Sequence, residues 1–462
     1  MYLKKAHIHF VGIGGIGMSG IAKILKYQGY KISGCDLDLK QKSIEDLIKI
    51  GCNISYGHNT HICQDQTIDI VVYSSAVKPS NPEIITAQKR GIPIIPRALM
   101  LAELMRTKYS IAISGAHGKT TTTSMISHIL IEAKLDPTVI IGGHLKNISA
   151  NAQFGTGDFL VAEADESDRS LLHLNSTFAV VTNIDLEHLE TYKDLDDIKN
   201  TFIQFINNLP FYGKAFLCVD DENIRSILPI PHVKIVKYGI EQEADVYAKN
   251  IELNTTNSTY DLWKNNKYLG KININMPGKH NVLNSLAAIA LCLDLEISFD
   301  VIAQALKNFK GIERRFSFNG HFNGAEVFDD YGHHPNEIIN TLAVARKYTT
   351  KKLHVVFQPH RYTRTEKLWY NFIQAFLDNP VDNLIITDIY AASEQPIANI
   401  TSQILVKEIK KISPNYPVTY LPISENFEQI IDKINLDVQQ NDLLLLLGAG
   451  KINNIASKII LK

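Results

Sequence analysis

The sequence predicts an α/β protein of three consecutive domains, each built on a mainly parallel sheet. Short apolar segments alternate with segments of helical periodicity along the 462-residue chain, which is typical of βαβ units. Two glycine-rich turns each follow an apolar segment and precede a helical one. At about 150 residues per domain, this length fits about three domains. We expect domains at residues 1–107, 108–312 and 313–462.

The composition is that of a globular chain without an overall charge. The 47 basic and 48 acidic residues nearly cancel, which argues against nucleic acid or an anionic membrane as a partner. No apolar run approaches the roughly 20 residues that span a bilayer, and the start leads directly into a strand, so we expect a cytoplasmic protein. The cysteines are odd in number and form no C-x-x-C pair, which predicts buried thiols with neither a disulfide nor a structural zinc: Cys35, Cys52, Cys63, Cys218 and Cys292.

The first block opens with a strand at 7–11, followed by a G-x-G-x-x-G turn and a helix that presents Met18, Ile21 and Leu25 on one face. Such glycines permit a tight turn and the close approach of a pyrophosphate, and an acidic residue after the next strand can accept a ribose hydroxyl bond. The candidate residues are Gly12, Gly14, Gly15, Gly17 and Asp36. The motif fits NAD or a UDP-sugar equally, and a glycine-rich turn without a ligand is the alternative.

The second block begins with a strand at 109–114 and a second glycine-rich turn that leads into a helix near Thr120. Backbone N–H groups of such a turn hold phosphate oxygens, Lys119 adds a cation, and the Thr120 hydroxyl can reach Mg²⁺. Ile113 stands where the first glycine of G-x-x-x-x-G-K-[ST] would be, so a helix merely capped by threonine is the alternative. The candidate nucleotide triphosphate site comprises Gly115, Ala116, His117, Gly118, Lys119, Thr120 and Thr121.

Carboxylates follow two further strands of this block. The strand at 159–162 leads into Glu163, which with Thr120 could hold Mg²⁺, because hard cations at phosphates take oxygen ligands. The strand at 178–182 leads to His188, either a ligand of a second metal or a hydrogen-bonded structural residue. Farther along, residues 250–271 predict an antiparallel hairpin region with Trp263 packed on it. An enzyme that uses ATP to ligate a UDP-linked substrate needs both glycine turns, whereas a dehydrogenase has little use for ATP.

Four segments resemble, in this order, the Mur ligases of bacterial cell-wall synthesis. They are residues 115–121, 182–188, 277–284 and 314–316. Residues 12–20, 329–335 and 360–365 are similar to the branch of that family that adds L-alanine. The resemblance covers essentially the whole chain.

The resemblance implies an N-terminal Rossmann-like domain for UDP-N-acetylmuramate, a central P-loop ATPase-type domain and a C-terminal Rossmann-like domain for the amino acid. ATP as co-substrate and Mg²⁺ would activate the lactyl carboxylate as an acyl phosphate, which L-alanine then attacks. The resemblance further implies a monomer or weak homodimer that acts on small molecules. Third-block strands are expected at 326–328, 353–357, 383–386 and 443–447.

The resemblance also implies roles for single residues. Lys119 would contact the β- and γ-phosphates. Thr120 and Glu163 would bind one Mg²⁺ ion, and His188 would bind a second Mg²⁺ ion. Asn281 would lie near the adenine, with helix capping as the alternative. Arg314 would reach the ATP phosphates, with a surface ion pair as the alternative. Asp329 would contact the ribose of the nucleotide. The residues around the amino acid would be Tyr331, His333, Arg361 and Arg364, and the catalytic set Lys119, Glu163, His188, Arg314 and His333.

Three alternatives stay open at this stage. A recycling ligase that joins a whole tripeptide to UDP-N-acetylmuramate has a similar length and similar nucleotide motifs. A non-catalytic nucleotide-binding regulator would need neither Glu163 nor Arg361, and a nicotinamide oxidoreductase would explain the first glycine turn only. The adjacent residues His333 and His334 are not expected to bind zinc. Several relatives carry a modified lysine after the metal-binding histidine. Lys199 lies near that position but not at the same spacing, so we assign no modified lysine.

Overall fold

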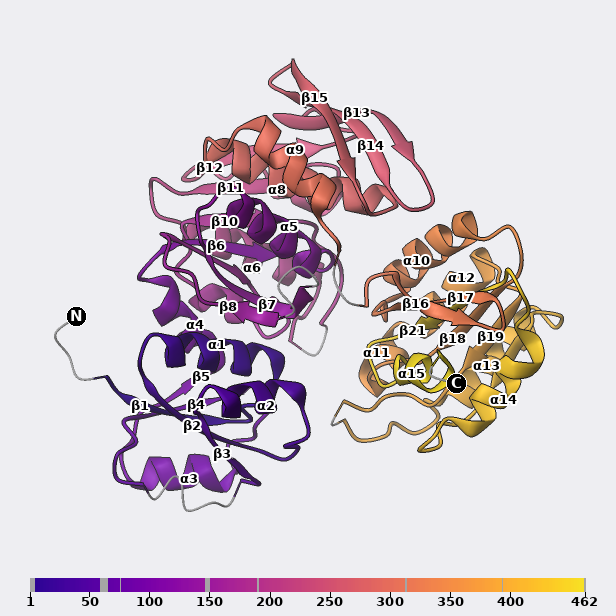
Figure 1. Cartoon of the computed structure of the whole chain (residues 1–462), viewed down its shortest axis with the longest axis horizontal. Coiled ribbons are helices and arrows are strands. Elements are labelled where there is room, and N and C mark those ends of the chain that lie inside the picture. The colour runs from indigo at the N-terminus through magenta and orange to yellow at the C-terminus, as the bar shows by residue number, and fades with distance from the viewer. Residues whose placement is uncertain are drawn as a thin grey trace. The chain divides into compact units, whose positions relative to one another are not determined.

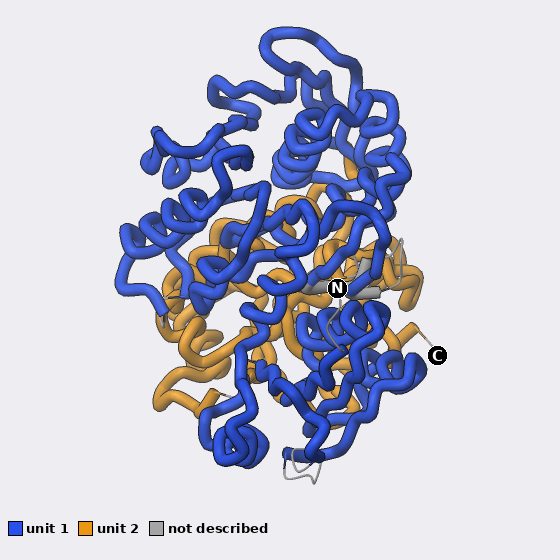
Figure 2. Tube along the Cα trace, turned by 90° about the vertical axis from the view of Figure 1, so that its left-hand side faces the viewer, with its two compact units in different colours: residues 1–253, 257–311 blue, residues 254–256, 312–462 orange. Residues whose placement is uncertain are grey.

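The computed structural model describes residues 5–58, 65–74, 76–145, 150–188, 191–311, 314–392 and 394–460. The chain divides into two compact units, shown in Figure 2. Unit 1 comprises Met1–Leu253 and Asn257–Gly311, and unit 2 comprises Asn254–Thr256 and Ile312–Lys462. Figure 1 shows the α/β elements of both units, which confirms the predicted fold class. The division of unit 1 after residue 107 stays a prediction.

The first sheet has the order β3-β2-β1-β4-β5, and its strands pair in parallel. Its strands are β1 (His7–Val11), β2 (Lys31–Asp36), β3 (Asn53–Tyr56), β4 (Ile70–Tyr73) and β5 (Ile94–Pro96). The helices of this region are α1 (Ile16–Tyr27), α2 (Lys42–Lys49), α3 (Pro82–Lys89) and α4 (Arg97–Met105). Met18, Ile21 and Leu25 of α1 are buried, as the helical periodicity predicts.

The central sheet has the order β15-β14-β13-β12-β11-β10-β6-β9-β7-β8. Its strands from β6 to β12 are β6 (Tyr109–Ser114), β7 (Thr138–Leu145), β8 (Ala150–Gln153), β9 (Phe159–Glu163), β10 (Phe178–Val181), β11 (Lys214–Cys218) and β12 (Lys234–Gly239). Strand β6 pairs in parallel with both β9 and β10. The three carboxyl ends therefore meet at one edge, where open α/β sheets bind ligands.

The predicted hairpin region is confirmed as an antiparallel extension of this sheet. It comprises β13 (Val246–Leu253), β14 (Ser258–Lys264) and β15 (Lys267–Ile274). Trp263 stacks on Tyr247 with ring centroids 6.2 Å apart. The other helices of unit 1 are α5 (Lys119–Glu132), η2 (Ser170–His173), α6 (Leu195–Asn207), α7 (Glu222–Ser226), α8 (Lys279–Asp294) and α9 (Phe299–Asn308). Helix α5 packs against α8 and α9.

Unit 2 is built on a sheet of order β16-β17-β21-β18-β19-β20. Its strands are β16 (Ser317–Phe322), β17 (Ala325–Asp330), β18 (Leu353–Phe357), β19 (Asn383–Ile386), β20 (Val418–Tyr420) and β21 (Leu443–Leu447). Its helices are α10 (Pro335–Tyr348), α11 (Tyr362–Lys367), α12 (Trp369–Asp378), α13 (Ser402–Ile412), α14 (Glu428–Asp437) and α15 (Asn454–Ile460). Successive residues of β21 enter two different cores, Leu445 one and Leu446 the other, so both faces of this sheet are covered.

The sequence also predicts the state of the cysteines and the absence of membrane-spanning helices. Four cysteines, Cys35, Cys52, Cys218 and Cys292, are buried free thiols, whereas Cys63 lies outside the described residues. Within the described ranges, none of the helices combines the length and the apolar character that crossing a bilayer requires.

Candidate active site

The second glycine turn connects β6 to α5, and two of its glycines are required by the geometry. Gly115 has φ +133°, and a Cβ atom there would lie 2.2 Å from Thr182 Oγ1. Gly118 has φ +83°, and a Cβ atom there would lie 2.4 Å from Asn284 Oδ1. Both positions therefore combine a left-handed backbone with close neighbours, and only glycine satisfies both conditions. Helix α5 begins at Lys119, one residue earlier than predicted.

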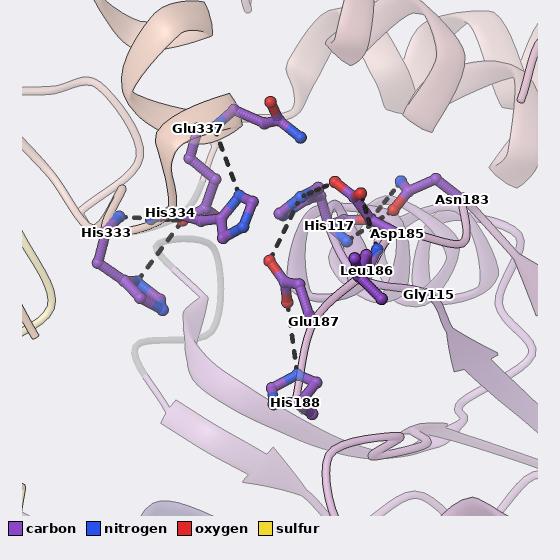
Figure 3. Close-up of polar contacts among 12 residues, drawn as sticks. Gly115, His117, Asn183, Asp185, Leu186, Glu187, His188, His333, His334 and Glu337 are labelled. Atoms are coloured by element: carbon purple, nitrogen blue, oxygen red, sulfur yellow. Dashed lines mark hydrogen bonds and ion pairs between the residues drawn. The ribbon is translucent and has the colours of Figure 1, made fainter. Parts of the chain in front are cut away.

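The turn is clamped by the residues that follow β10. The backbone N–H of His117 donates to Asn183 Oδ1 at 2.8 Å, and Asn183 Nδ2 donates to the His117 carbonyl at 2.9 Å. Thr182 Oγ1 donates to the same carbonyl at 2.6 Å. Figure 3 shows Asn183 beside His117. Neither clamp residue was assigned a role from the sequence, although both lie in a segment that resembles the family.

Lys119 lies under the turn and is held by an acidic partner. Its Nζ is 2.8 Å from Glu166 Oε1, and it donates to the carbonyls of Gly115 and Ala116 at 2.5 and 3.2 Å. Burial is the largest single influence and would lower the pKa of Lys119, but the charge and hydrogen bond of Glu166, together with the charges of Asp165 and Glu187, outweigh it, so the net pKa is raised. Lys119 is therefore a fixed cation at the helix N-terminus that faces the turn.

A group of metal-type ligands lies beside this lysine. His188 Nε2 is 3.3 Å from Glu166 Oε1 and 3.4 Å from Glu187 Oε2, and one ligand atom from each of the three residues lies within 4.8 Å of the other two. Glu166 is buried, and its Oε2 has no hydrogen-bond partner within the described part of the chain. Figure 3 shows Glu187 between His117 and His188. His117 Nε2 is 3.5 Å from carboxylate oxygens of both Asp185 and Glu187.

This group differs in membership from the predicted metal set. His188 belongs to it, but its carboxylates are Glu166 and Glu187, which the sequence analysis did not assign. Glu163 ends β9 and pairs in register with Ile113 of β6, beside the start of the turn. Thr120 lies in the first turn of α5. Glu163 and Thr120 thus lie at the same sheet edge, and their metal roles stay predictions.

Asn281 lies in the first turn of α8 and does not cap it. The N-cap residue of α8 is Gly278, which makes no side-chain cap bond, so the capping alternative is wrong. The Asn281 amide donates to the Pro277 carbonyl at 2.7 Å. One turn later, Asn284 Oδ1 accepts from Thr122 of α5 at 3.3 Å. The start of α8 therefore lies against the start of α5, and the contact with adenine stays a prediction.

The first glycine turn is held by Asp36 at the end of β2. The backbone N–H of Gly14 donates to Asp36 Oδ2 at 2.8 Å, and a Cβ atom at Gly14 would lie 2.9 Å from the same oxygen. Gly12 has φ +77°. Asp36 thus lies against the first glycine turn through Gly14, while the binding of the UDP substrate by Gly12, Gly14, Gly15, Gly17 and Asp36 stays a prediction.

Arg97, the first residue of α4, lies between the two candidate nucleotide sites. A Cβ atom at Gly17 would lie 3.2 Å from Arg97 Nη1, and Arg97 Nη2 is 3.5 Å from Asp165 Oδ2 in the acidic segment after β9. Nothing in the sequence marks Arg97 as a site residue, because a single arginine before a helix carries no motif. Its position shows that a cation faces the amino end of α1.

In unit 2, Arg314 is half-buried and forms an ion pair with Asp329, so the ion pair of the alternative is present although it does not lie on the surface; the contact with ATP stays a prediction. Its Nη2 donates to the carbonyls of Gly448 and Gly450 at 2.7 and 3.3 Å, and its Nε is 3.6 Å from Asp329 Oδ2. The guanidinium lies 4.9 Å from the centroid of the Tyr331 ring. Burial lowers the pKa of Arg314, and Asp329 acts against this shift.

Most of the predicted amino-acid residues gather around His360, which was not assigned. The His333 and His360 rings are 5.3 Å apart, and His360 stacks on Tyr390 at 5.4 Å. Arg364 Nη1 lies 3.3 Å from His360 Nδ1. Burial, with His333 and the nearby arginines, lowers the pKa of His360 to about 3, so a neutral imidazole accepts from Arg364.

The neighbouring histidines of this loop have different tasks. His334 caps α10 by accepting from the Asn336 N–H at 3.4 Å. The His333 N–H donates to Glu337 Oε2 at 3.0 Å, and its ring lies 3.0 Å from the Tyr331 carbonyl. Figure 3 shows Glu337 beside both histidines. Glu337 therefore fixes the loop that carries His333.

Three family models match the chain in succession. They are described as "Mur ligase family, catalytic domain" at residues 7–109, "Mur ligase middle domain" at 113–292 and "Mur ligase, glutamate ligase domain" at 314–450. A UDP-N-acetylmuramate–L-alanine ligase of Geotalea daltonii is 48% identical over 100% of this chain and 99% of its own length. A protein of the same name from Syntrophus aciditrophicus is 46% identical over 100% and 94%.

Solved structures are similar to the whole chain as well. The crystal structure of the UDP-N-acetylmuramate-alanine ligase MurC from Thermotoga maritima aligns with a TM-score of 0.82 and 28% identity, and covers 98% of each chain. A murein peptide ligase from Psychrobacter arcticus aligns with a TM-score of 0.73 over 99% of this chain and 98% of its own. Since its identity is 23%, the second similarity shows the fold alone.

Proposed function

Because this chain belongs to the Mur ligase family, we propose that it joins L-alanine to the lactyl carboxylate of UDP-N-acetylmuramate in peptidoglycan precursor synthesis, with ATP converted to ADP and phosphate. The observation that carries this proposal is the similarity of 46–48% identity along nearly full lengths to ligases of that name. The two glycine turns of unit 1 support it, because the reaction needs one site for UDP and another for ATP.

The chemistry has two steps. An oxygen of the lactyl carboxylate attacks the γ-phosphorus, the bond to the β–γ bridging oxygen breaks, and ADP leaves. The amine of L-alanine, after losing a proton, attacks the acyl carbon, and the bond to phosphate breaks. Because two anions approach each other in the first step, charge neutralisation and positioning dominate this catalysis.

In this proposal Lys119 supplies the fixed positive charge. Its ammonium is held beside the turn by Glu166 and by two carbonyls of the turn, and it would exchange a carbonyl partner for a phosphate oxygen when ATP binds. The clamp of Asn183 on His117 holds the turn in one conformation. The preformed turn and the helix N-terminus then bind the terminal phosphates.

The residues beside Lys119 fit Mg²⁺. Glu166 Oε2 is a buried carboxylate oxygen without a hydrogen-bond partner in the described ranges, and Glu187, His188, Thr120 and Glu163 lie at the same edge of the sheet. Bound Mg²⁺ would neutralise charge on the terminal phosphates of ATP. We expect EDTA to abolish turnover and Mg²⁺ to restore it.

Unit 2 would bind the amino acid and part of the nucleotide. Arg361 and Arg364 would attract the carboxylate of L-alanine, with His333 and Tyr331 beside it, and Arg314 and Asp329 would contact ATP. The neutral His360 keeps Arg364 oriented without adding a charge. We expect the enzyme to act in the cytoplasm as a monomer or weak homodimer, which sedimentation at several concentrations would test.

The decisive experiment measures phosphate release from ATP and Mg²⁺ with UDP-N-acetylmuramate present. Three reactions are compared, with L-alanine, with the tripeptide L-Ala-γ-D-Glu-diaminopimelate, and with neither. Release that depends on L-alanine is the expected result. Release only with the tripeptide would assign the recycling ligase, and no release with either would favour a non-catalytic nucleotide-binding protein.

A further inference from the structure

Three metal-type ligands are buried together between the first sheet and α3, and none of them belongs to the group beside Lys119. His9 and Cys35 are 0% exposed and Glu83 is 2% exposed. One ligand atom from each lies within 4.8 Å of the other two. We propose that His9, Cys35 and Glu83 bind a divalent transition metal of the zinc class.

The parallel register of the sheet brings these residues together. His9 pairs with Ser33, and Val11 with Cys35, so His9 and Cys35 lie on the same face of adjacent strands. Cys35 packs in one core cluster with Ile84 and Ala87 of α3, which shows that α3 covers this face. Glu83, in the first turn of α3, supplies the carboxylate.

The hydrogen-bond network around His9 fits a ligand nitrogen. His9 Nδ1 is 2.9 Å from Ser33 Oγ, and the same hydroxyl is 2.8 Å from His7 Nε2. His7 Nδ1 is in turn 2.8 Å from Thr67 Oγ1. In one consistent arrangement, His9 Nδ1–H donates to Ser33, Ser33 donates to His7, and His7 donates to Thr67. This arrangement resembles the outer-shell partners that orient metal-bound histidines.

The other ring nitrogen of His9 is left for the metal. His9 Nε2 is buried and has no hydrogen-bond partner among the described residues, which is costly unless an ion or water occupies the position. With Nδ1 hydrogen-bonded to Ser33, Nε2 is the ring nitrogen that can offer its lone pair to a metal. A neutral imidazole is the form that binds metals.

The donor set selects the class of ion. Nitrogen, sulfur and one carboxylate oxygen suit Zn²⁺ or Co²⁺ better than Mg²⁺, which prefers oxygen ligands only. A thiolate and a carboxylate together cancel the charge of a divalent ion, so the buried complex would be neutral. The Cys35 proton is released when the metal binds. His58 Nδ1, 3.2 Å from Cys35 Sγ, is placed to hydrogen-bond the sulfur.

The metal would stabilise the strand that carries the first glycine turn. The carbonyl of Cys35 accepts from the N–H groups of Gly12 and Ile13 at 2.9 and 3.1 Å. Asp36, which holds Gly14, is the next residue along β2. Zinc-class metal should therefore raise the thermal stability of the full chain, with no change required in the chemistry at Lys119.

Titration of the full chain with Co²⁺ after EDTA treatment tests this site. A cobalt–thiolate charge-transfer absorbance should appear in the near ultraviolet at one equivalent, and Zn²⁺ should displace it. Cys35→Ser should abolish the band, and Glu83→Gln should weaken Co²⁺ binding by about 10-fold or more. Cys292→Ser, which removes another buried free thiol, is the matched control and should keep the band.

His188→Ala separates this site from the ligands beside Lys119, and the thiolate band should survive in it. Absence of the band in the unaltered protein overturns the proposal even if Cys35→Ser fails to fold. A band that persists in Cys35→Ser, or that disappears in Cys292→Ser, overturns it as well. Because the readout is absorbance and melting temperature, failure here would leave the ligase proposal untouched.

Discussion

The two glycine turns of unit 1 follow the same strand–turn–helix plan but differ in their charged neighbours. The first turn is held by a carboxylate, Asp36, which accepts from Gly14, and its facing cation, Arg97, comes from a distant helix. The second turn carries its own cation, Lys119, with Glu166 against it. Under the proposed function this difference fits a first turn that only recognises a pyrophosphate and a second turn that takes part in phosphoryl transfer, because only the latter must neutralise charge that develops during reaction.

The two turns also differ in which segments hold their backbones. The His117 backbone exchanges two hydrogen bonds with Asn183 and receives a third from Thr182, all from one segment after β10. The first turn is held from two segments: its backbone N–H groups donate to the Cys35 carbonyl and to Asp36 of β2, and Ser43 of α2 donates to the Gly14 carbonyl. In the second turn three of these bonds meet at a single residue, His117, directly before Gly118 and Lys119. If this turn binds ATP as proposed, fixing that residue helps to place the reacting phosphate, whose misplacement would cost rate.

Removing Lys119, the cation of the second turn, should have the largest effect on turnover. Lys119→Ala should lower kcat by at least about 100-fold, because a fixed charge at the reacting phosphate is lost. Phosphate release with saturating substrates measures this. The variant also leaves Glu166 buried without its partner, so its melting temperature should fall.

A double variant separates the two effects of that change. Lys119→Ala combined with Glu166→Gln removes the unpaired charge, so stability should recover in part while turnover stays low. Turnover near the unaltered level in Lys119→Ala would contradict the role given to this lysine.

A methyl group in the second turn should have the next largest effect. Gly115→Ala places a Cβ atom 2.2 Å from Thr182 Oγ1 at φ +133°, so the clamp must move, and we expect kcat/KM for ATP to fall by about 10- to 100-fold. Gly29→Ala is the matched control, because Gly29 also has a positive φ, +89°, but nothing lies within 4 Å of its Cβ position. Equal losses of activity in both variants would show that backbone strain alone is responsible.

Loss of Arg97, the cation that faces the first turn, should weaken binding of the UDP substrate but not of ATP. Arg97→Gln should raise KM for UDP-N-acetylmuramate by about 10-fold, the loss of roughly one charge-assisted hydrogen bond, with KM for ATP little changed. Arg106→Gln is the control, since Arg106 directly follows the same helix α4 and is 61% exposed. A rise in both KM values would mean that Arg97 acts through Asp165 on the second turn.

The smallest expected effect concerns Asp36. Asp36→Ala should weaken UDP-substrate binding by a few-fold to about 10-fold, because Gly14 loses its acceptor and the ribose a partner. Isothermal titration with UDP-N-acetylmuramate and, separately, with ATP measures the selectivity. An equal loss of affinity for both ligands would contradict the assignment of the UDP substrate to the first turn and of ATP to the second.

Sequence patterns predicted the elements whose signals are local. Apolar runs such as 159–162 and 443–447 became buried strands, and both glycine turns lie between strand and helix as expected. Short strands without an apolar run, β16 and β20, were not predicted. Their residues gain strand geometry from neighbours in the sheet, because strand preference depends on context.

By itself, the sequence determined the α/β class, the two phosphate-type turns and the family, because backbone preferences and residue spacing act over a few neighbours. Only the tertiary structure decided which side chains share a site. Glu166 meets Lys119 and His188, Arg97 meets Gly17, and His360 meets His333 across long separations in the chain. The absence of a structural zinc stays a prediction that the Co²⁺ titration tests. Strand register places Cys35 beside His9, and the packing of α3 brings Glu83 to them. Such contacts follow from register and packing, which no local spacing encodes.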